Sequence, residues 1–295
     1  MVKIVPHLWL DDNAKEAVEF YTSLIKGSKV NWLYTITDTP SGDCDLLEFE
    51  IAGKTIAVIS GGPYFQLDES ISFMLSCDSK EEVSRLTEAF LADGQVMMPL
   101  GQYPFNPHYA WVKDKYGMTW QLFTDDSLSQ PYKLEYCLLF ADKLVGLAKP
   151  ALGYYGQLFN TPVLDVNEYQ PGEAHDDRAK INYGKIVMED TAIIAMDHGY
   201  TGDKVFSEAV SLMVYCDTQE EVDTYWEALN HVPAAAQCGW CKDQFGVSWQ
   251  VVPSWLMTLY QSDNLEGIKA VNQAVLKMKK LDLAAMQAAF ESAKD

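Results

Sequence analysis

The sequence has few positive charges, and it lacks the long apolar run that a membrane helix requires. Lys and Arg number 22 against 42 Asp and Glu, which gives a formal net charge of −20. Such a surface repels a phosphate backbone, so nucleic acid is excluded as a favoured partner. A transmembrane helix needs about 18 or more consecutive apolar residues, and no such run occurs here. We therefore expect neither a nucleic-acid nor a membrane partner.

Secretion features are also missing. Residues 1–10 do not combine a cationic stretch, an apolar core and a small-residue cleavage site, as a signal peptide would. The chain has only six cysteines in 295 residues, and we expect reduced thiols and a cytoplasmic protein. At about 100–200 residues per domain, the length is enough for two ordinary domains.

The chain repeats itself, because three blocks occur in the same order in both halves. Residues 72–78 match 211–217, residues 81–83 match 220–222, and residues 111–121 match 240–250. The offset is 139 for the first two blocks and 129 for the third, so the second half has lost about ten residues. We predict one domain at 1–128, a second at 132–262 and a tail at 263–295.

The apolar pattern within each half predicts two modules of the order strand, helix and three strands. Strands are expected at 3–10, 29–37, 44–52, 54–60, 71–77, 96–100, 108–113 and 118–123. Capping boxes at Asn13, Ser79 and Thr218, each with Glu three residues later, mark helix starts. In the tail, the apolar spacing and the helix-end residues predict one helix from Leu265 to Met278 and a short one capped by Asp282.

The repeated hairpin carries a recognisable pattern, Asp-x-aromatic-Gly-x-x-Trp-Gln, at residues 114–121 and 243–250. Together with the first strand at 6–10 and the tail motif at 278–282, it resembles the vicinal-oxygen-chelate (glyoxalase/bleomycin-resistance/dioxygenase) superfamily. The PhnB-like branch, described as 3-demethylubiquinone-9 3-methyltransferase-like, is the most similar. The resemblance implies an α+β fold of tandem glyoxalase-like domains, each with two βαβββ modules forming an eight-stranded cup, plus a C-terminal helical tail.

The resemblance also implies a divalent metal inside each cup, held by the first, fourth, fifth and eighth strands of a half. Here these positions supply His7 and Gln121 in the first half, and Cys137 and Gln250 in the second. The fourth and fifth strands offer no ligand, although Asp197 and His198 follow one of them closely. Since an ion needs three or four ligands, we expect no cofactor. Any Zn, Ni, Fe or Mn would bind at His7 and Gln121.

His7 has two interpretations. It is a pocket residue that binds substrate or acts as a general base, or it is a buried histidine satisfied by Gln121. Both place His7 and Gln121 in the same cup. The ligand-binding residues that we predict line the two cups: His7, Trp9, Trp111, Gln121, Cys137, Trp240 and Gln250. Trp120 and Trp249 are expected in the core.

Three further motifs have structural explanations that we favour. Cys238 and Cys241 have the spacing of a metal or redox pair, but their counterparts lie on a predicted strand, where residues three apart face opposite sides. The acidic stretch at 173–177 follows Pro and Gly and predicts a solvated loop. The turn at 60–63 continues into Pro-Tyr-Phe, so it is not the Gly-rich strand-to-helix turn of a nucleotide-binding methyltransferase.

Three functions fit these observations. The first is a small-molecule binding protein with degenerate metal sites. The second is a metal-dependent lyase or dioxygenase-like enzyme that acts on a small organic substrate. The third is a structural or regulatory protein, with a second copy of the chain as its partner in a homodimer. The incomplete ligand sets favour the first over the second.

Overall fold

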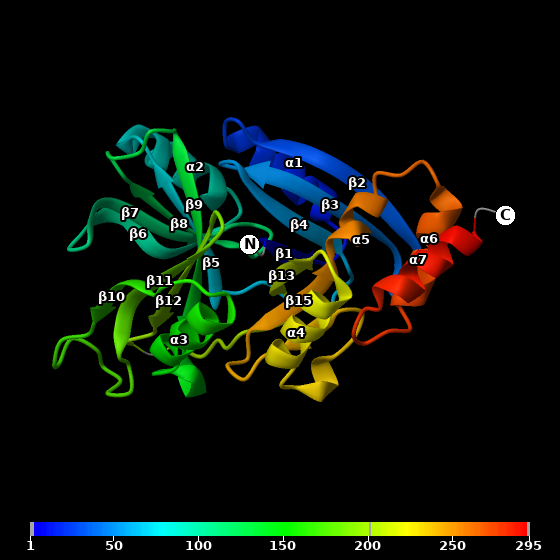
Figure 1. The fold of residues 1–295 in the computed structure, drawn as a ribbon. Helices are drawn as coiled ribbons and strands as arrows, with labels where there is room; N and C mark the ends of the chain where they lie inside the picture. The colour runs from blue at the N-terminus through cyan, green and yellow to red at the C-terminus, as the bar shows by residue number, and fades with distance from the viewer. Residues whose placement is uncertain (1–2, 201, 294–295) are drawn as a thin grey trace.

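A computed structural model describes residues 3–200 and 202–293. Four modules of one strand, one helix and two or three further strands follow one another (Figure 1). The first two modules are β1 (Ile4–Leu10), α1 (Ala14–Leu24), β2 (Lys29–Thr39), β3 (Gly42–Ile51), β4 (Lys54–Ser60), and β5 (Ile71–Cys77), α2 (Lys80–Leu91), β6 (Gln95–Tyr103), β7 (Asn106–Lys113), β8 (Thr119–Thr124). The other two are β9 (Tyr132–Phe140), α3 (Ala148–Leu158), β10 (Leu164–Glu168), β11 (Ile181–Met188), β12 (Thr191–Asp197), and β13 (Val210–Cys216), α4 (Gln219–Leu229), β14 (Trp240–Lys242), β15 (Ser248–Pro253).

The chain ends in three helices, α5 (Ser254–Leu259), α6 (Leu265–Val275) and α7 (Leu283–Ser292). Sequence patterns predicted the last two, but α5 was missed. The predicted caps at Ser79, Thr218 and Asp282 are confirmed, because each side chain accepts a backbone N–H bond three residues on. Asn13 is the N-cap residue of α1, as predicted, but its side chain makes no capping bond; the Ser60 hydroxyl accepts from the N–H of Ala14. No helix of the described residues is long and apolar enough to cross a membrane.

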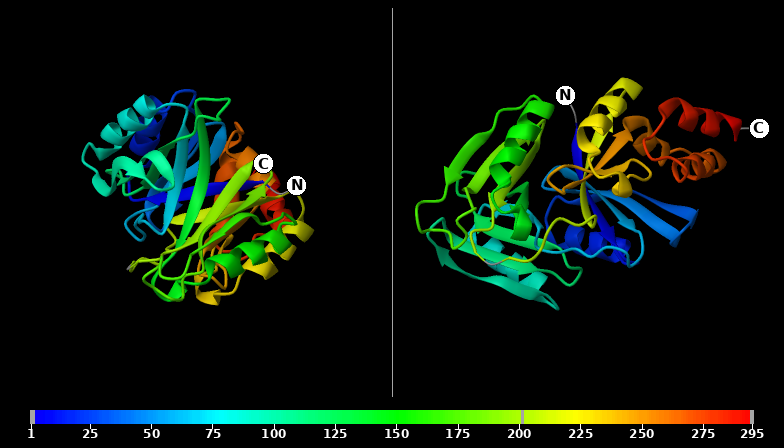
Figure 2. Two further views of the ribbon diagram at one scale, coloured as in Figure 1. Left: turned by 90° about the vertical axis from the view of Figure 1, so that its left-hand side faces the viewer. Right: turned by 90° about the horizontal axis from the view of Figure 1, so that it is seen from below.

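The modules form two sheets, and each sheet combines modules from both halves. One sheet has seven strands in the order β14-β15-β13-β1-β4-β3-β2, and the other has eight in the order β10-β11-β12-β9-β5-β8-β7-β6. Modules one and four therefore share a sheet, as do modules two and three. Figure 2 shows this exchange by colour: blue lies with yellow and orange in one body, and cyan with green in the other.

The α+β fold of tandem βαβββ modules with C-terminal helices is confirmed, but the expected pairing of modules is corrected. β1 pairs with β13, not with a strand of module two, and β5 pairs with β9. Both contacts join the first strands of two modules in antiparallel fashion. His7 therefore lies in the seven-stranded sheet and Gln121 in the eight-stranded one.

The motif that carries the resemblance is a buried hydrogen-bond network. The Asp114 carboxylate accepts from the Tyr21 hydroxyl and the Trp120 indole, both at 2.8 Å, and from the N–H groups of Tyr116 and Met118. Asp243 makes the same four bonds in the second half. Trp120 and Trp249 are fully buried, as predicted. The motif thus ties each half's last hairpin to the helix of its first module.

The tail covers the edge where module four is short of a strand. A 3₁₀ turn at Pro233–Ala235 follows α4 in place of the strand equivalent to β6. The N–H groups of Cys238 and Gly239 donate to the carbonyls of Met278 and Lys279 at 2.8 and 2.7 Å. Cys238 lies in this turn with a positive φ of 53°, not on the strand expected for it. All six cysteines are free.

Candidate functional site

The inner face of each sheet, opposite helices α1–α4, holds one of the predicted pairs. In the seven-stranded sheet, His7 lies opposite Ser211, and the amide of Gln250 donates to the Ser211 hydroxyl at 2.9 Å. In the eight-stranded sheet, Cys137 lies opposite Ser72, and the amide of Gln121 donates to the Ser72 hydroxyl at 2.7 Å. The two arrangements are equivalent.

The predicted contact between His7 and Gln121 is therefore wrong, because the halves exchange modules. His7 shares its sheet with Gln250, and Cys137 shares its sheet with Gln121. Gln121 is already satisfied, since its carbonyl oxygen accepts from the Tyr109 hydroxyl at 2.9 Å. The sequence placed His7, Gln121, Cys137 and Gln250 at equivalent strand positions, but it paired His7 with Gln121 instead of Gln250.

His7 is a neutral, buried imidazole. Its side chain is 3% exposed, and the edge of its ring meets the Trp240 ring at 5.3 Å between centroids. Burial lowers the pKa of His7 to about 3, because a charged imidazolium is poorly solvated there. Among the described residues, its Nδ1 has no hydrogen-bond partner. Trp9 lies beside Trp240 at 6.0 Å and donates from its indole to the carbonyl of Gly62.

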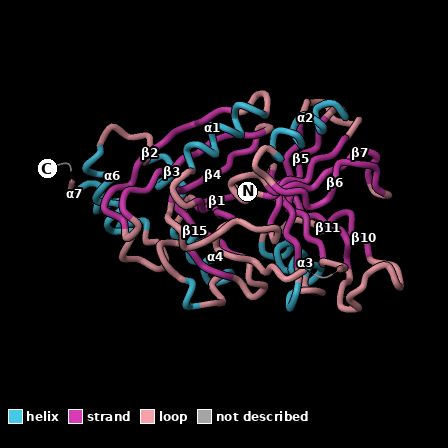
Figure 3. Tube along the Cα trace, turned by 180° about the vertical axis from the view of Figure 1, so that it is seen from behind, coloured by secondary structure: helices cyan, strands magenta, loops and turns pink. Residues whose placement is uncertain are grey.

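The chain's own tail packs on the inner face of the seven-stranded sheet. Val5, Met213 and Val252 of this face belong to one apolar cluster with residues of α5, α6 and α7. Tyr260, just after α5, stacks on Trp32 of β2 at 5.5 Å. Figure 3 shows the tail helices beside β2 and β3, at the end of the molecule away from β7 and β10.

On the inner face of the eight-stranded sheet, no helix of the described ranges contributes to the apolar cluster. Its apolar centre consists of Met74, Cys137 and Ile194, with Phe123, Tyr183 and Met196 partly buried around them. Met74 is the counterpart of Met213, so equivalent positions face the tail in one sheet and their own sheet's side chains in the other.

Polar groups surround this apolar centre. Glu135 is 5% exposed and forms ion pairs with Lys133 at 2.8 Å and Lys185 at 3.7 Å. The Trp111 indole N–H is buried, and no described residue accepts from it. Burial raises the pKa of the Cys137 thiol to about 12, so a nucleophilic thiolate does not form near neutral pH. Trp111 and Cys137 were predicted from the sequence as residues that line the cups, but Glu135 was not. The one sequence feature that could have indicated Glu135 is a charged residue within a largely apolar strand.

The side chains at the two superfamily positions do not fit a divalent metal. One set has an imidazole, an amide and a hydroxyl, and the other has a thiol of raised pKa in place of the imidazole. Across the described residues, no three His, Cys, Asp or Glu side chains cluster as a metal site would require. Asp197 is occupied by four backbone N–H groups, from Gly146, Ala148, Lys180 and Ile181. We therefore assign no chemical step to a metal here.

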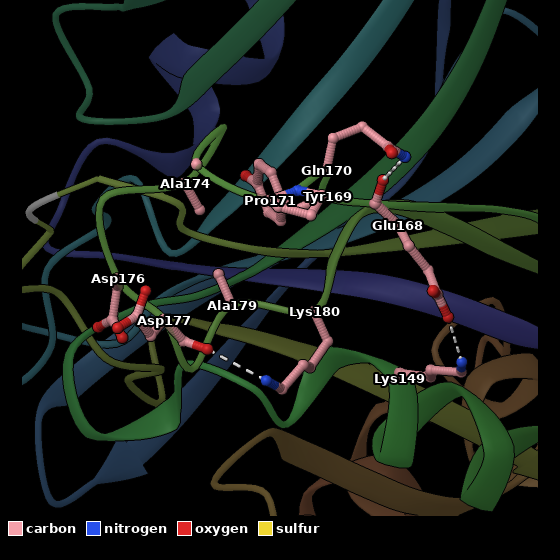
Figure 4. Close-up of a pocket in the computed structure, with 11 residues that line it drawn as sticks. Lys149, Glu168, Tyr169, Gln170, Pro171, Ala174, Asp176, Asp177, Ala179 and Lys180 are labelled. Atoms are coloured by element: carbon pink, nitrogen blue, oxygen red, sulfur yellow. Dashed lines mark hydrogen bonds and ion pairs between the residues drawn. The ribbon is translucent and has the colours of Figure 1, made fainter.

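The acidic stretch at 173–177 is a loop, as predicted, and it borders a surface pocket of about 310 Å³ (Figure 4). Both lysines that line the pocket already have partners: Lys149 donates to Glu168 at 2.6 Å, and Lys180 donates to the carbonyl of Asp177 at 3.1 Å. The strand β4 ends at Ser60 and residues 61–63 form a loop, where Gly61 lies against the ring of Trp9.

The paired βαβββ modules, with His7/Gln250 and Cys137/Gln121 at equivalent positions, define a tandem protein of the vicinal-oxygen-chelate superfamily. Glyoxalase I from Zea mays has the same fold: its structure matches 89% of this chain and 97% of its own, with 12% identity and a TM-score of 0.56. The model of the 3-demethylubiquinone-9 3-methyltransferase family matches residues 2–123 and again 132–252. The chain belongs to this family.

A shorter relative has been solved as well. The putative 3-demethylubiquinone-9 3-methyltransferase PhnB protein from Bacillus cereus is 29% identical, and 99% of it matches 42% of this chain, with a TM-score of 0.39. No curated protein matches the chain significantly.

Proposed function

We propose that the protein binds a small organic molecule on the inner face of the eight-stranded sheet and does so without a metal. One observation carries this proposal: the chain's own tail helices pack on the equivalent face of the seven-stranded sheet, whereas the apolar cluster on this face contains only residues of strands. The ligand set at either position supports binding rather than the metal-dependent lyase or dioxygenase chemistry considered from the sequence. Cytoplasmic location and a homodimer belong to the same proposal.

The chemistry of this face suits a flat, largely apolar ligand with one acceptor group. Met74, Phe123 and Met196 supply apolar contacts, and thioethers adapt to aromatic rings. The unpartnered indole N–H of Trp111 supplies a donor, and a buried donor without an acceptor costs about 1–3 kcal/mol. An acceptor on the ligand removes that cost.

The test uses 8-anilinonaphthalene-1-sulfonate, which has aromatic rings and an acceptor group, and a matched pair of variants. Met74→Ala should weaken binding several-fold, since it removes an apolar contact on the uncovered face. Met213→Ala, at the equivalent covered position, should leave the dissociation constant unchanged and lower stability instead. Equal effects on binding, or no saturable binding by the unmodified protein, would favour the structural or regulatory alternative.

The metal-free part has its own test. Elemental analysis of freshly purified protein should find far less than one Zn, Ni, Fe or Mn per chain. About one metal per chain that disappears in His7→Ala would overturn this part of the proposal and return the enzyme alternative to first place.

A further inference from the structure

A second cavity lies away from both inner-face pairs, where the tail meets the seven-stranded sheet. Its volume is about 440 Å³, within the range of small-molecule sites. The walls come from three modules and from α5, and they include Trp32 of β2, Glu48 of β3, Tyr215 of β13 and Met257 of α5.

One polar group in this cavity has no partner. The Tyr215 hydroxyl is buried, and no described residue lies within hydrogen-bond geometry of it. Its pKa is well above the ordinary tyrosine value because of burial and of the nearby Glu48 carboxylate. The group is therefore a neutral phenol that can accept one hydrogen bond and donate another.

The charge of the lining is negative. Three carboxylates, those of Glu48, Glu189 and Asp217, face one ammonium group, that of Lys3. The Lys3 ammonium lies over the Tyr215 ring at 5.4 Å from its centroid, which shows that this ring already accommodates a cation. Trp32 provides a second aromatic wall.

We propose that this cavity binds a small organic amine. The protonated nitrogen lies near Glu48 and donates to the Tyr215 hydroxyl, and its apolar or ring-bearing part packs between Trp32 and Met257. The combination of unpaired phenol, aromatic walls and excess carboxylates selects a cation over an anion of the same shape. This site is independent of the one proposed on the eight-stranded sheet.

The experiment compares phenethylamine with 3-phenylpropionate by calorimetric titration of the full chain. Phenethylamine should bind at least about tenfold more tightly than the anion. Glu48→Gln and Tyr215→Phe should each weaken the amine several-fold, and far-UV circular dichroism checks that both variants stay folded. Glu168→Gln, which changes a carboxylate of the loop pocket in Figure 4, is the matched control and should have no effect. Met74→Ala should also leave amine binding unchanged.

Two results would overturn the proposal. One is the absence of saturable phenethylamine binding at millimolar concentration. The other is binding that Glu48→Gln and Tyr215→Phe do not alter, or that 3-phenylpropionate matches, since the cavity would then recognise apolar surface alone.

Discussion

Replacing Asp243 by alanine should remove a large part of the protein's stability. Its carboxylate is 1% exposed and accepts from Tyr155, Trp249, Phe245 and Val247 at 2.6 to 3.0 Å. Alanine leaves four donors without an acceptor. A buried donor left unsatisfied costs about 1–3 kcal/mol, but the four costs do not add fully because water can enter the space. A hydrogen bond to a charged group contributes about 1.5–3 kcal/mol, so with incomplete additivity we expect a total loss of about 3–5 kcal/mol.

The assay is urea unfolding followed by far-UV circular dichroism. Asp243→Asn should lose less than the alanine variant, because its remaining oxygen can still accept from Phe245 and Val247. Asp114→Ala, in the equivalent network of the first half, should lose a similar amount. Glu227→Ala on the exposed side of α4 is the control and should stay within about 0.5 kcal/mol. A loss below about 1 kcal/mol for Asp243→Ala would refute the assigned role of the motif.

Three further predictions concern His7, the tail and the exchange of modules. The pKa of His7 is about 3 in the folded protein and near 6.5 in the unfolded chain. The contribution of His7 to stability is therefore fully present above pH 6.5 and falls as the pH drops toward 3, by up to about 1.4 kcal/mol per pH unit. The pH dependence of stability should be flatter in His7→Gln, and equal slopes in the two proteins would count against a neutral buried imidazole. Ile268→Ala in α6, fully buried against the seven-stranded sheet, should cost about 2–5 kcal/mol in urea unfolding, whereas Leu265→Ala, at a residue 62% exposed, should cost little. Fragments 1–128 and 132–295 should form a stable 1:1 complex when mixed, because each sheet needs both; size-exclusion chromatography showing two folded monomers that ignore each other would contradict the observed pairing.

Most of the local structure could be predicted from the sequence. Period-2 and helical apolar patterns define the strands and helices, because alternate residues of each strand face the same apolar layer. The repeat at 72–78 and 211–217 defines equivalent strands. The shorter offset showed that about ten residues are lost before the second hairpin, but three strands were still expected after α4, and the structure has two. The side-chain cap at Asn13 does not form, and the first N–H of the helix, that of Ala14, instead donates to Ser60, 46 residues further on; local sequence does not show such a distant acceptor.

The pairing of modules could not be predicted in the same way. β1 had two candidate partners in β5 and β13, and these carry the same pattern, Ser72-Phe73-Met74 and Ser211-Leu212-Met213. Both β5 and β13 have the backbone N–H and C=O groups that β1 needs for pairing, and both have apolar residues at the same positions along the strand. Hydrogen bonding and burial are then nearly equal for both choices, so a pattern read along one strand does not distinguish them.

The tail has no counterpart in the first half, and it makes the two sheets unequal. Its backbone pairs with the edge beside β14, where a strand is missing, and its apolar side chains then meet Met213 and Val252 on the inner face. Met74, at the position equivalent to Met213, has no such neighbour from the tail. Two sites that are equivalent in sequence, His7 with Gln250 and Cys137 with Gln121, therefore have different surroundings. Their residue types follow from the repeat, whereas the side chains that pack on each inner face depend on where the non-repeated tail lies.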